Sequence, residues 1–361
     1  MTTVSKPLGV AQTEPRAQAT TPSRSLAFDY QMMILGTVML FGVFLDGWAH
    51  NHGRVDDSFF TPWHAVLYGG YALAGGRLVL AQFVNVGRGY KWLRALPPGY
   101  ILSLLGVIIF GGAGIVDMIW HETFGFEENL EALLSPSHLL LMTGALLIMT
   151  GPLRAAWLDA TPYRQRGWRF LLPAIMSVTS VFALLSFFLA YAYFTEDLTY
   201  LVGIRPGGSR GIVDAMGIMG LLVPPMLLTA CILFLRRRWR LPFGTVTLML
   251  CLTVLLMTWL SLDATYEFLL AVPMLMAGLV GDVLLWRYNS PQRLAWLRLM
   301  AFGAPFAIIL LYLITIQQFS GQFLWWEIHM WLGAPVLAGV LGYLLSFVAY
   351  PPAMPPNAAT D

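Results

Sequence analysis

Long apolar stretches separated by short polar segments follow one another along almost the whole chain of 361 residues. A membrane-spanning helix needs about 20 mostly apolar residues. Ten stretches are of about that length, and they lie at 30–49, 61–84, 97–120, 135–153, 169–194, 210–235, 242–261, 265–286, 299–318 and 328–350. The pattern predicts an all-α fold, a polytopic transmembrane helix bundle of about ten spans arranged as five hairpins. Because only a short turn around Ser261–Thr265 separates the seventh and eighth stretches, nine spans are an alternative.

Basic residues gather in every second loop and so predict the orientation of the chain. The clearest examples are Arg88, Lys91 and Arg94 after the second span and the run Arg236–Arg240 after the sixth. Cytoplasmic loops of membrane proteins carry an excess of Lys and Arg. We therefore expect both termini in the cytoplasm, with polar residues 1–27 as a disordered tail and residues 351–361 as a second tail.

The composition agrees with a protein embedded in lipid. Hydrophobic residues make up 58% of the chain and charged residues 11%, whereas a soluble domain carries about 25% charged residues. The lipid bilayer of a plasma or inner membrane is the predicted partner, and the basic runs fit membrane-surface anchors better than a nucleic-acid site. Both cysteines lie inside apolar stretches, which argues against a disulfide framework.

The first two hairpins carry the same polar pattern. An aspartate and a histidine four residues apart end the first helix of each hairpin, and another histidine opens the second helix. These residues are Asp46, His50 and His64 in the first hairpin and Asp117, His121 and His138 in the second. The Asp and His pair recurs after 71 residues and the following histidine after 74. The pattern predicts an internal repeat, with a four-helix metal-site unit at 28–153 and the remaining bundle at 154–350.

Helix geometry is expected to bring each set of three side chains together. Residues at i and i+4 lie on one helix face. Thr61 and Ser135 suit an N-cap, and Pro62 and Pro136 suit the first helical position, so the histidine that follows falls in the first turn. Imidazole and carboxylate groups together suit a transition metal. We predict these six residues as metal ligands; alternatively, the histidines cap helices or hydrogen-bond the aspartates.

The Asp-x3-His sequence, followed by a histidine on the next helix, resembles the metal motif of the C subunit of copper membrane monooxygenases, the particulate methane and ammonia oxidisers. The resemblance implies copper near the outer face, held by Asp46, His50 and His64, with Asp117, His121 and His138 as a second copy. Zinc and iron are alternatives to copper. The motif occurs twice here, and the chain has more spans than that subunit, so only the metal type and an oxidation chemistry are carried over as expectations.

Three functions are compatible with these residues. The first is copper handling or a metal-dependent oxidoreductase, with a periplasmic metal chaperone or other membrane subunits as partners. The second is an ion- or proton-coupled transporter that uses the same acids and histidines as a relay. The third is a b-type haem protein, which usually needs histidines deeper in the bundle. Whether the two trios form one site or two is open.

Overall fold

The computed structural model describes eight stretches of the chain: residues 20–54, 60–125, 129–159, 167–194, 210–261, 269–287, 294–319 and 326–352. Within them the chain forms helices and connecting turns and no strand, which confirms the predicted all-α class. The predicted tails lie mostly outside the described residues, at 1–19 and 353–361.

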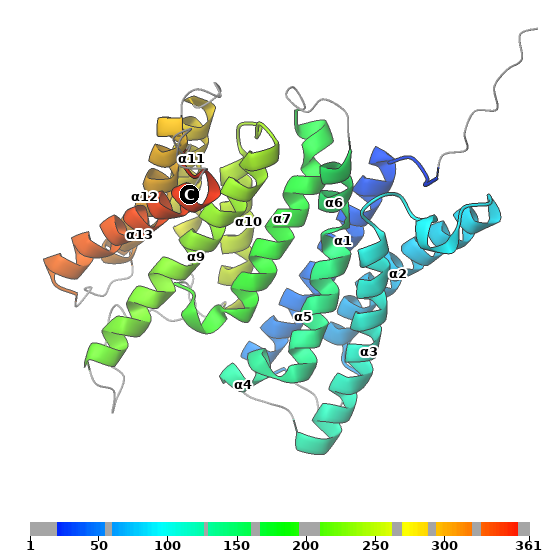
Figure 1. Ribbon diagram of the computed structural model, residues 1–361. Helices are drawn as coiled ribbons and strands as arrows, with labels where there is room; N and C mark the ends of the chain where they lie inside the picture. Colours follow the sequence, from blue (N-terminus) through cyan, green and yellow to red (C-terminus); the bar gives the residue numbers. More distant parts are fainter. Residues whose placement is uncertain are drawn as a thin grey trace, which may run out of the picture.

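Helices lie in each of the ten predicted stretches, as far as these are described (Figure 1). They are α1 (Leu26–Asn51), α2 (Pro62–Gly87), α3 (Ile101–Phe124), α5 (Pro136–Met149), α6 (Gly151–Leu158), α7 (Trp168–Phe188), α9 (Arg210–Arg238), α10 (Thr245–Leu260), α11 (Ala271–Arg287), α12 (Leu294–Phe319) and α13 (Ile328–Ala349). The short helix α4 (Asn129–Leu134) lies between the third and fourth stretches. Among the described residues six helices are long and apolar enough to cross a membrane, and the bent pair of α5 and α6 makes up to seven. The chain is a multi-pass helical membrane protein, and the count of ten spans stays a prediction.

The fourth predicted span is broken. A single helix was expected over 135–153, but α5 ends at Met149 and α6 continues to Leu158 at an angle of 41°. Pro152 lies in the first turn of α6. Proline has no N–H to donate, and its ring clashes with the carbonyl four residues earlier, so a continuous helix is interrupted here.

Apolar side chains cover the outside of the bundle. Leu73 of α2 is 60% exposed, Ile108 of α3 68% and Val348 of α13 79%. Large exposed apolar areas are rare on soluble monomers. This outer surface suits contact with lipid acyl chains, while large side chains such as Phe44 and Phe110 fill the interior.

Helices α1, α2, α3 and α5 form the unit that positions the candidate site. In each hairpin a glycine lets the two helices approach closely, as small residues do in membrane bundles. A Cβ atom added at Gly70 of α2 would lie 2.9 Å from the Cα of Met39 in α1, and one added at Gly144 of α5 would lie 2.9 Å from the Cα of Phe110 in α3. The two hairpins therefore pack through corresponding positions, because Phe110 follows Met39 by 71 residues and Gly144 follows Gly70 by 74.

A network of charged groups lies at the end of this unit where α1 begins. It places the start of α1 before the predicted boundary at residue 28. The Ser25 hydroxyl caps α1 by accepting from the Phe28 amide. Arg24 Nε lies 2.7 Å from Asp29, and its Nη1 lies 2.8 Å from Asp159, which follows α6. Residues 20–27 thus belong in part to the bundle.

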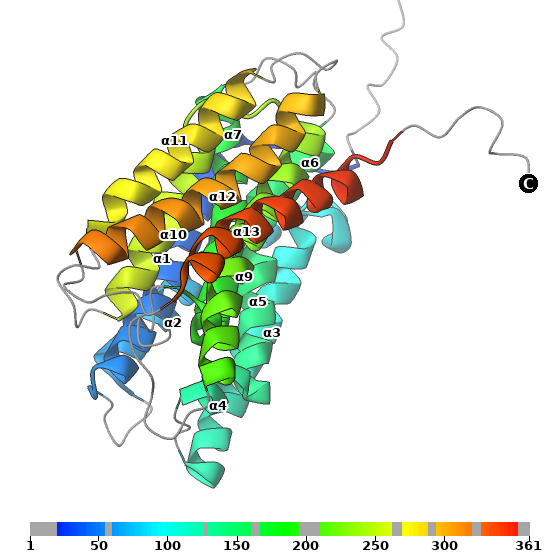
Figure 2. The same ribbon diagram turned by 90° about the vertical axis from the view of Figure 1, so that its left-hand side faces the viewer.

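Figures 1 and 2 show α1 to α6 on one side of the molecule and α9 to α13 on the other, with α7 between them. The N-terminal end of α1 and the C-terminal end of α13 lie at the same end of the bundle. The C-terminal end of α3 and helix α4 lie at the opposite end. The two histidine trios belong to this second end, away from the described ends of the chain.

Candidate metal centre

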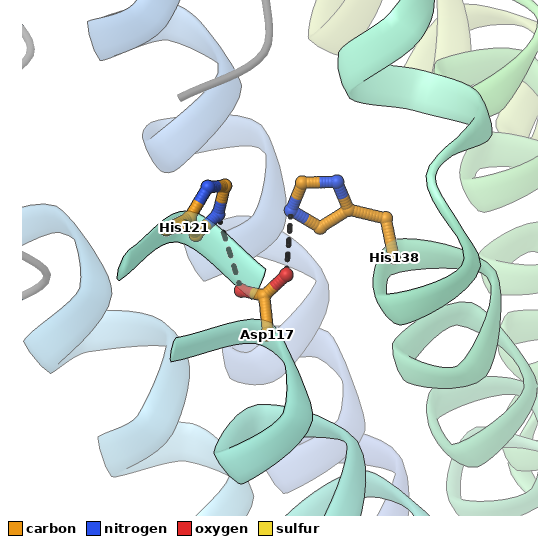
Figure 3. A group of neighbouring side chains, drawn as sticks. All are labelled: Asp117, His121 and His138. Carbon is orange, nitrogen blue, oxygen red and sulfur yellow. Dashed lines mark ion pairs between the residues drawn. The ribbon is translucent and has the colours of Figure 1, made fainter. Parts of the chain in front are cut away.

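Two helices bring the second trio together. Asp117 and His121 lie one turn apart near the C-terminal end of α3, and His138 lies in the first turn of α5. The α5 helix begins as the sequence predicts, because Pro136 is at its first position and the Ser135 hydroxyl accepts from the His138 amide at 3.4 Å. Figure 3 shows the three side chains meeting between the two helices.

The distances within this trio suit a bound cation. His121 Nε2 lies 3.6 Å from Asp117 Oδ2, and His138 Nε2 lies 3.3 Å from Asp117 Oδ1. One ligand atom from each residue lies within 4.8 Å of the other two. Two ligands bound at 2.0–2.1 Å to a tetrahedral metal lie about 3.4 Å apart. The two Asp–His distances are therefore near the spacing of ligands on one ion, and the three side chains lie close enough together that they could hold one.

A backbone carbonyl determines which nitrogen of the His138 ring carries the hydrogen. Its Nδ1 lies 2.6 Å from the carbonyl oxygen of Ala132 in α4 and 2.8 Å from the Ser135 hydroxyl. A carbonyl only accepts, so Nδ1 must carry the hydrogen. In the neutral ring Nε2 then presents a lone pair to the carboxylate. Histidines that bind metals are oriented in this way, with the second ring nitrogen donating to a carbonyl or carboxylate.

Burial makes this arrangement costly without a positive charge. The Asp117 side chain is only 3% exposed, and its Oδ1 is buried without a hydrogen-bond donor among the described residues. A buried carboxylate without compensation costs several kcal/mol, and the side chains of Ser137 and His121 compensate Asp117 in part by hydrogen bonding to it. The Oδ1 atom instead faces the Nε2 of His138. A cation between these two atoms, either a metal ion or a proton on the ring, removes the conflict.

The first trio is similar in plan but more open. His64 Nε2 lies 3.4 Å from Asp46 Oδ1, whereas His50 Nε2 lies 4.0 Å from Asp46 Oδ2. The side chains of Asp46 and His50 are 20% and 36% exposed. Thr61 caps α2 by accepting from the His64 amide at 3.1 Å, as predicted. Among the described residues, however, the group of three that meets closely enough to hold a metal is the second trio, so metal binding by the first stays a prediction.

Two contributors to the site were not predicted from the sequence. One is the Ala132 carbonyl, which α4 places beside His138. The sequence signal that could have indicated α4 is the loop of the second hairpin. This loop is three residues longer than that of the first hairpin, and its residues 130–134 favour a helix. The other is Tyr68, one turn beyond His64 on α2, whose ring centroid lies 6.1 Å from that of His64. It reads as an ordinary aromatic residue in an apolar stretch.

Fold and site together define a multi-pass helical membrane protein that has, in the part of the chain that the structure describes, one Asp/His/His group that could hold a metal ion. Comparison with protein-family models, with curated proteins and with solved structures gives no match for this chain. The resemblance to the C subunit of copper monooxygenases therefore rests on its motif.

Proposed function

We propose that this protein binds a transition metal ion, copper in the first place, at Asp117, His121 and His138. The observation that supports this most strongly is the contact of His138 Nε2 with the buried Asp117 at 3.3 Å, while the other nitrogen of that ring donates to Ala132. The lone pair and the carboxylate point at the same space, which a metal ion would fill.

The donor set favours copper over its alternatives. Two imidazoles and one carboxylate form a nitrogen- and oxygen-rich site, and divalent copper binds such sites more strongly than zinc or iron does. Three protein ligands leave at least one coordination position open, as in catalytic metal sites. Copper handling and metal-dependent oxidation both need such an open position, the first for transfer of the ion and the second for a substrate. The predicted non-cytoplasmic location of the site fits delivery by a periplasmic chaperone.

The duplication of the first two hairpins is part of this proposal. The corresponding contacts at Gly70 and Gly144, and the ion pairs of Asp46 with His64 and of Asp117 with His138, all support it. The ancestral unit would then be one hairpin with one Asp/His/His set.

Metal analysis of the purified protein tests the proposal. Protein isolated from membranes and reconstituted in nanodiscs is expected to bind copper at a stoichiometry of at least one ion per chain. His138→Ala should lower that stoichiometry or weaken binding at least about tenfold. His329→Ala is the matched control, because its imidazole is 83% exposed and pairs with Glu327 at the start of α13. Wild-type protein that binds no copper, zinc or iron would contradict the proposal.

A proton-coupled transporter is the second candidate. The same contact supports it, because a proton on His138 would satisfy both Ala132 and Asp117. Transporters often have internal repeats with their binding site between the repeats, although near the middle of the membrane. Here the trio lies at the C-terminal end of α3 and the start of α5. Figure 1 shows that end of α3 at one end of the bundle, which favours the metal site. Proton or ion flux in proteoliposomes that is lost in Asp117→Asn, from protein that binds no metal, would establish this alternative.

A further inference from the structure

The two hairpins contact each other in a way that a twofold rotation would produce. Gly36 of α1 packs against α5, where a Cβ added to it would lie 3.5 Å from Met149 Cγ. Gly75 of α2 packs against α3, where a Cβ added to it would lie 3.0 Å from Val107 Cγ1. With the repeat offset of 71, the counterpart of Gly36 in the second hairpin is Val107. With the offset of 74, the counterpart of Gly75 is Met149. Each contact is therefore the counterpart of the other.

A direct bond between corresponding residues marks where such a rotation axis would pass. The Tyr100 hydroxyl donates to Asp29 Oδ1 at 2.7 Å, and the two residues are 71 positions apart. In a twofold arrangement a residue meets its own counterpart only near the axis. The Asp29–Tyr100 pair lies at the end of the bundle where α1 and α3 begin. The axis would then run between the hairpins toward the end that carries the trios.

The helix ends that carry the trios agree with this. His50 lies in the last turn of α1 and His121 in the last turn of α3. His50 and His121 are again counterparts, 71 residues apart. The two trios therefore occupy corresponding helix ends on the two sides of the same line.

Tyr68 connects the two trios. Its ring contacts that of His64 at 6.1 Å between centroids, and its hydroxyl lies against α3, where a Cβ added at Gly114 would come within 2.8 Å of the Tyr68 Oη. Gly114 is one turn before Asp117. The counterpart of Tyr68 in the second hairpin is Met142, so the chain places one polar ring, not two, between the trios.

We propose that the two trios flank a pseudo-twofold axis and form a single dinuclear metal centre, with Tyr68 as a positioning residue between them. This inference rests on the proposed metal function. It assigns Asp46, His50 and His64 to the same centre as the second trio. Metal sites built from side chains on facing helices are common in four-helix bundles.

A copper titration with electron paramagnetic resonance tests this centre. Two Cu(II) ions per chain are expected to bind in two steps, the second weaker by at least about tenfold because the two divalent ions repel each other. At two equivalents the spins should couple, so that the signal is broadened or lost instead of doubled. Asp46→Asn should remove the second step and leave an uncoupled signal from one ion.

The outcomes separate this inference from the proposed function. No copper at all would overturn the proposed function. A single ion that is lost in Asp117→Asn and unaffected by Asp46→Asn would keep the function and overturn the dinuclear centre. Two ions whose signals simply add would also overturn it.

Tyr68→Phe tests the assignment of the tyrosine. Two ions should still bind, but the coupled signal should change, because the hydroxyl that reaches α3 one turn before Asp117 is gone. Tyr71→Phe is the matched control, since its phenol also crosses to α3 but donates to the Val107 carbonyl at 2.9 Å. Equal responses of the two variants, or none in either, would overturn the role of Tyr68.

Discussion

The two Asp/His/His trios have the same residue types and nearly the same spacing, yet the protein encloses them differently. In the second trio the aspartate is 3% exposed and lies 3.3 Å and 3.6 Å from its histidines. In the first trio the aspartate is 20% exposed, and the corresponding distances are 3.4 Å and 4.0 Å. The distance between the aspartate and the histidine on the next helix is thus nearly the same in both trios. The distance between the aspartate and the histidine one turn later on its own helix is longer in the first trio.

The second hairpin adds support around its ligands. Helix α4 directs the Ala132 carbonyl at the Nδ1 of His138, and the Asp117 carboxylate is enclosed by the protein. Ligands that are already oriented lose less conformational entropy on binding. The motif therefore supplies the donor atoms, while the loop between the helices determines how well they are oriented for binding. The second trio should be the tighter site.

Asparagine at each aspartate is the sharpest way to test this ranking. Asp117→Asn removes the anionic ligand of the prepared trio, and the first copper-binding step should weaken by about 100-fold or more, since even the loss of an outer partner costs 10–100-fold. Asp46→Asn should change that first step by less than about tenfold. Competition with a copper chelator of known affinity measures both. Equal losses in the two variants would show that burial and orientation do not distinguish the trios.

Alanine at the two packing glycines tests whether the hairpins are built alike. Gly144→Ala and Gly70→Ala each force a methyl group against the backbone of the facing helix, 2.9 Å from its Cα. Each should lower the free energy of unfolding by about 1–3 kcal/mol, as measured by reversible unfolding in mixed micelles.

Gly69→Ala is the control for this pair. An added Cβ at Gly69 meets nothing within 4 Å, and alanine is the better helix former by up to about 1 kcal/mol. This variant should be neutral or stabilising. A loss at Gly144 with none at Gly70 would break the structural correspondence of the two hairpins.

Much of the fold could be predicted because a bilayer imposes simple rules on sequence. The apolar stretches needed only a length criterion, and the caps at Thr61 and Ser135 follow from the hydrogen-bonding needs of any helix start. The break between α5 and α6 was not predicted, although Pro152 indicates it. The prediction used hydrophobicity alone, which does not distinguish a bent span from a straight one.

The ligand side chains of the candidate site could be predicted from the sequence, but the groups that orient them could not. Asp117, His121 and His138 are polar residues at regular spacing in apolar surroundings, which makes them visible in the sequence. The Ala132 carbonyl leaves no signal in the sequence, because every residue has a backbone carbonyl. The contact of Tyr68 with the second hairpin depends on how α2 crosses α3, which no local pattern encodes.

Removal of the two capping hydroxyls gives the smallest expected difference and the most specific one. Ser135→Ala removes the cap of α5 and also the hydroxyl 2.8 Å from His138 Nδ1. Thr61→Ala removes the matching cap of α2. Each variant should lose about 1 kcal/mol of stability. Only Ser135→Ala should weaken the first copper-binding step, by about tenfold, because it disturbs an outer partner of a ligand.

Ser135→Thr separates the two roles of this hydroxyl, since threonine retains both the cap and the oxygen next to the ring. It should bind copper as the wild type does. Should Ser135→Ala lose stability but keep its copper affinity, the Ala132 carbonyl alone would orient His138. The advantage of the second trio would then come from helix α4 and from the burial of Asp117, and a chimaera that carries the longer loop in the first hairpin would be expected to tighten the first trio to match.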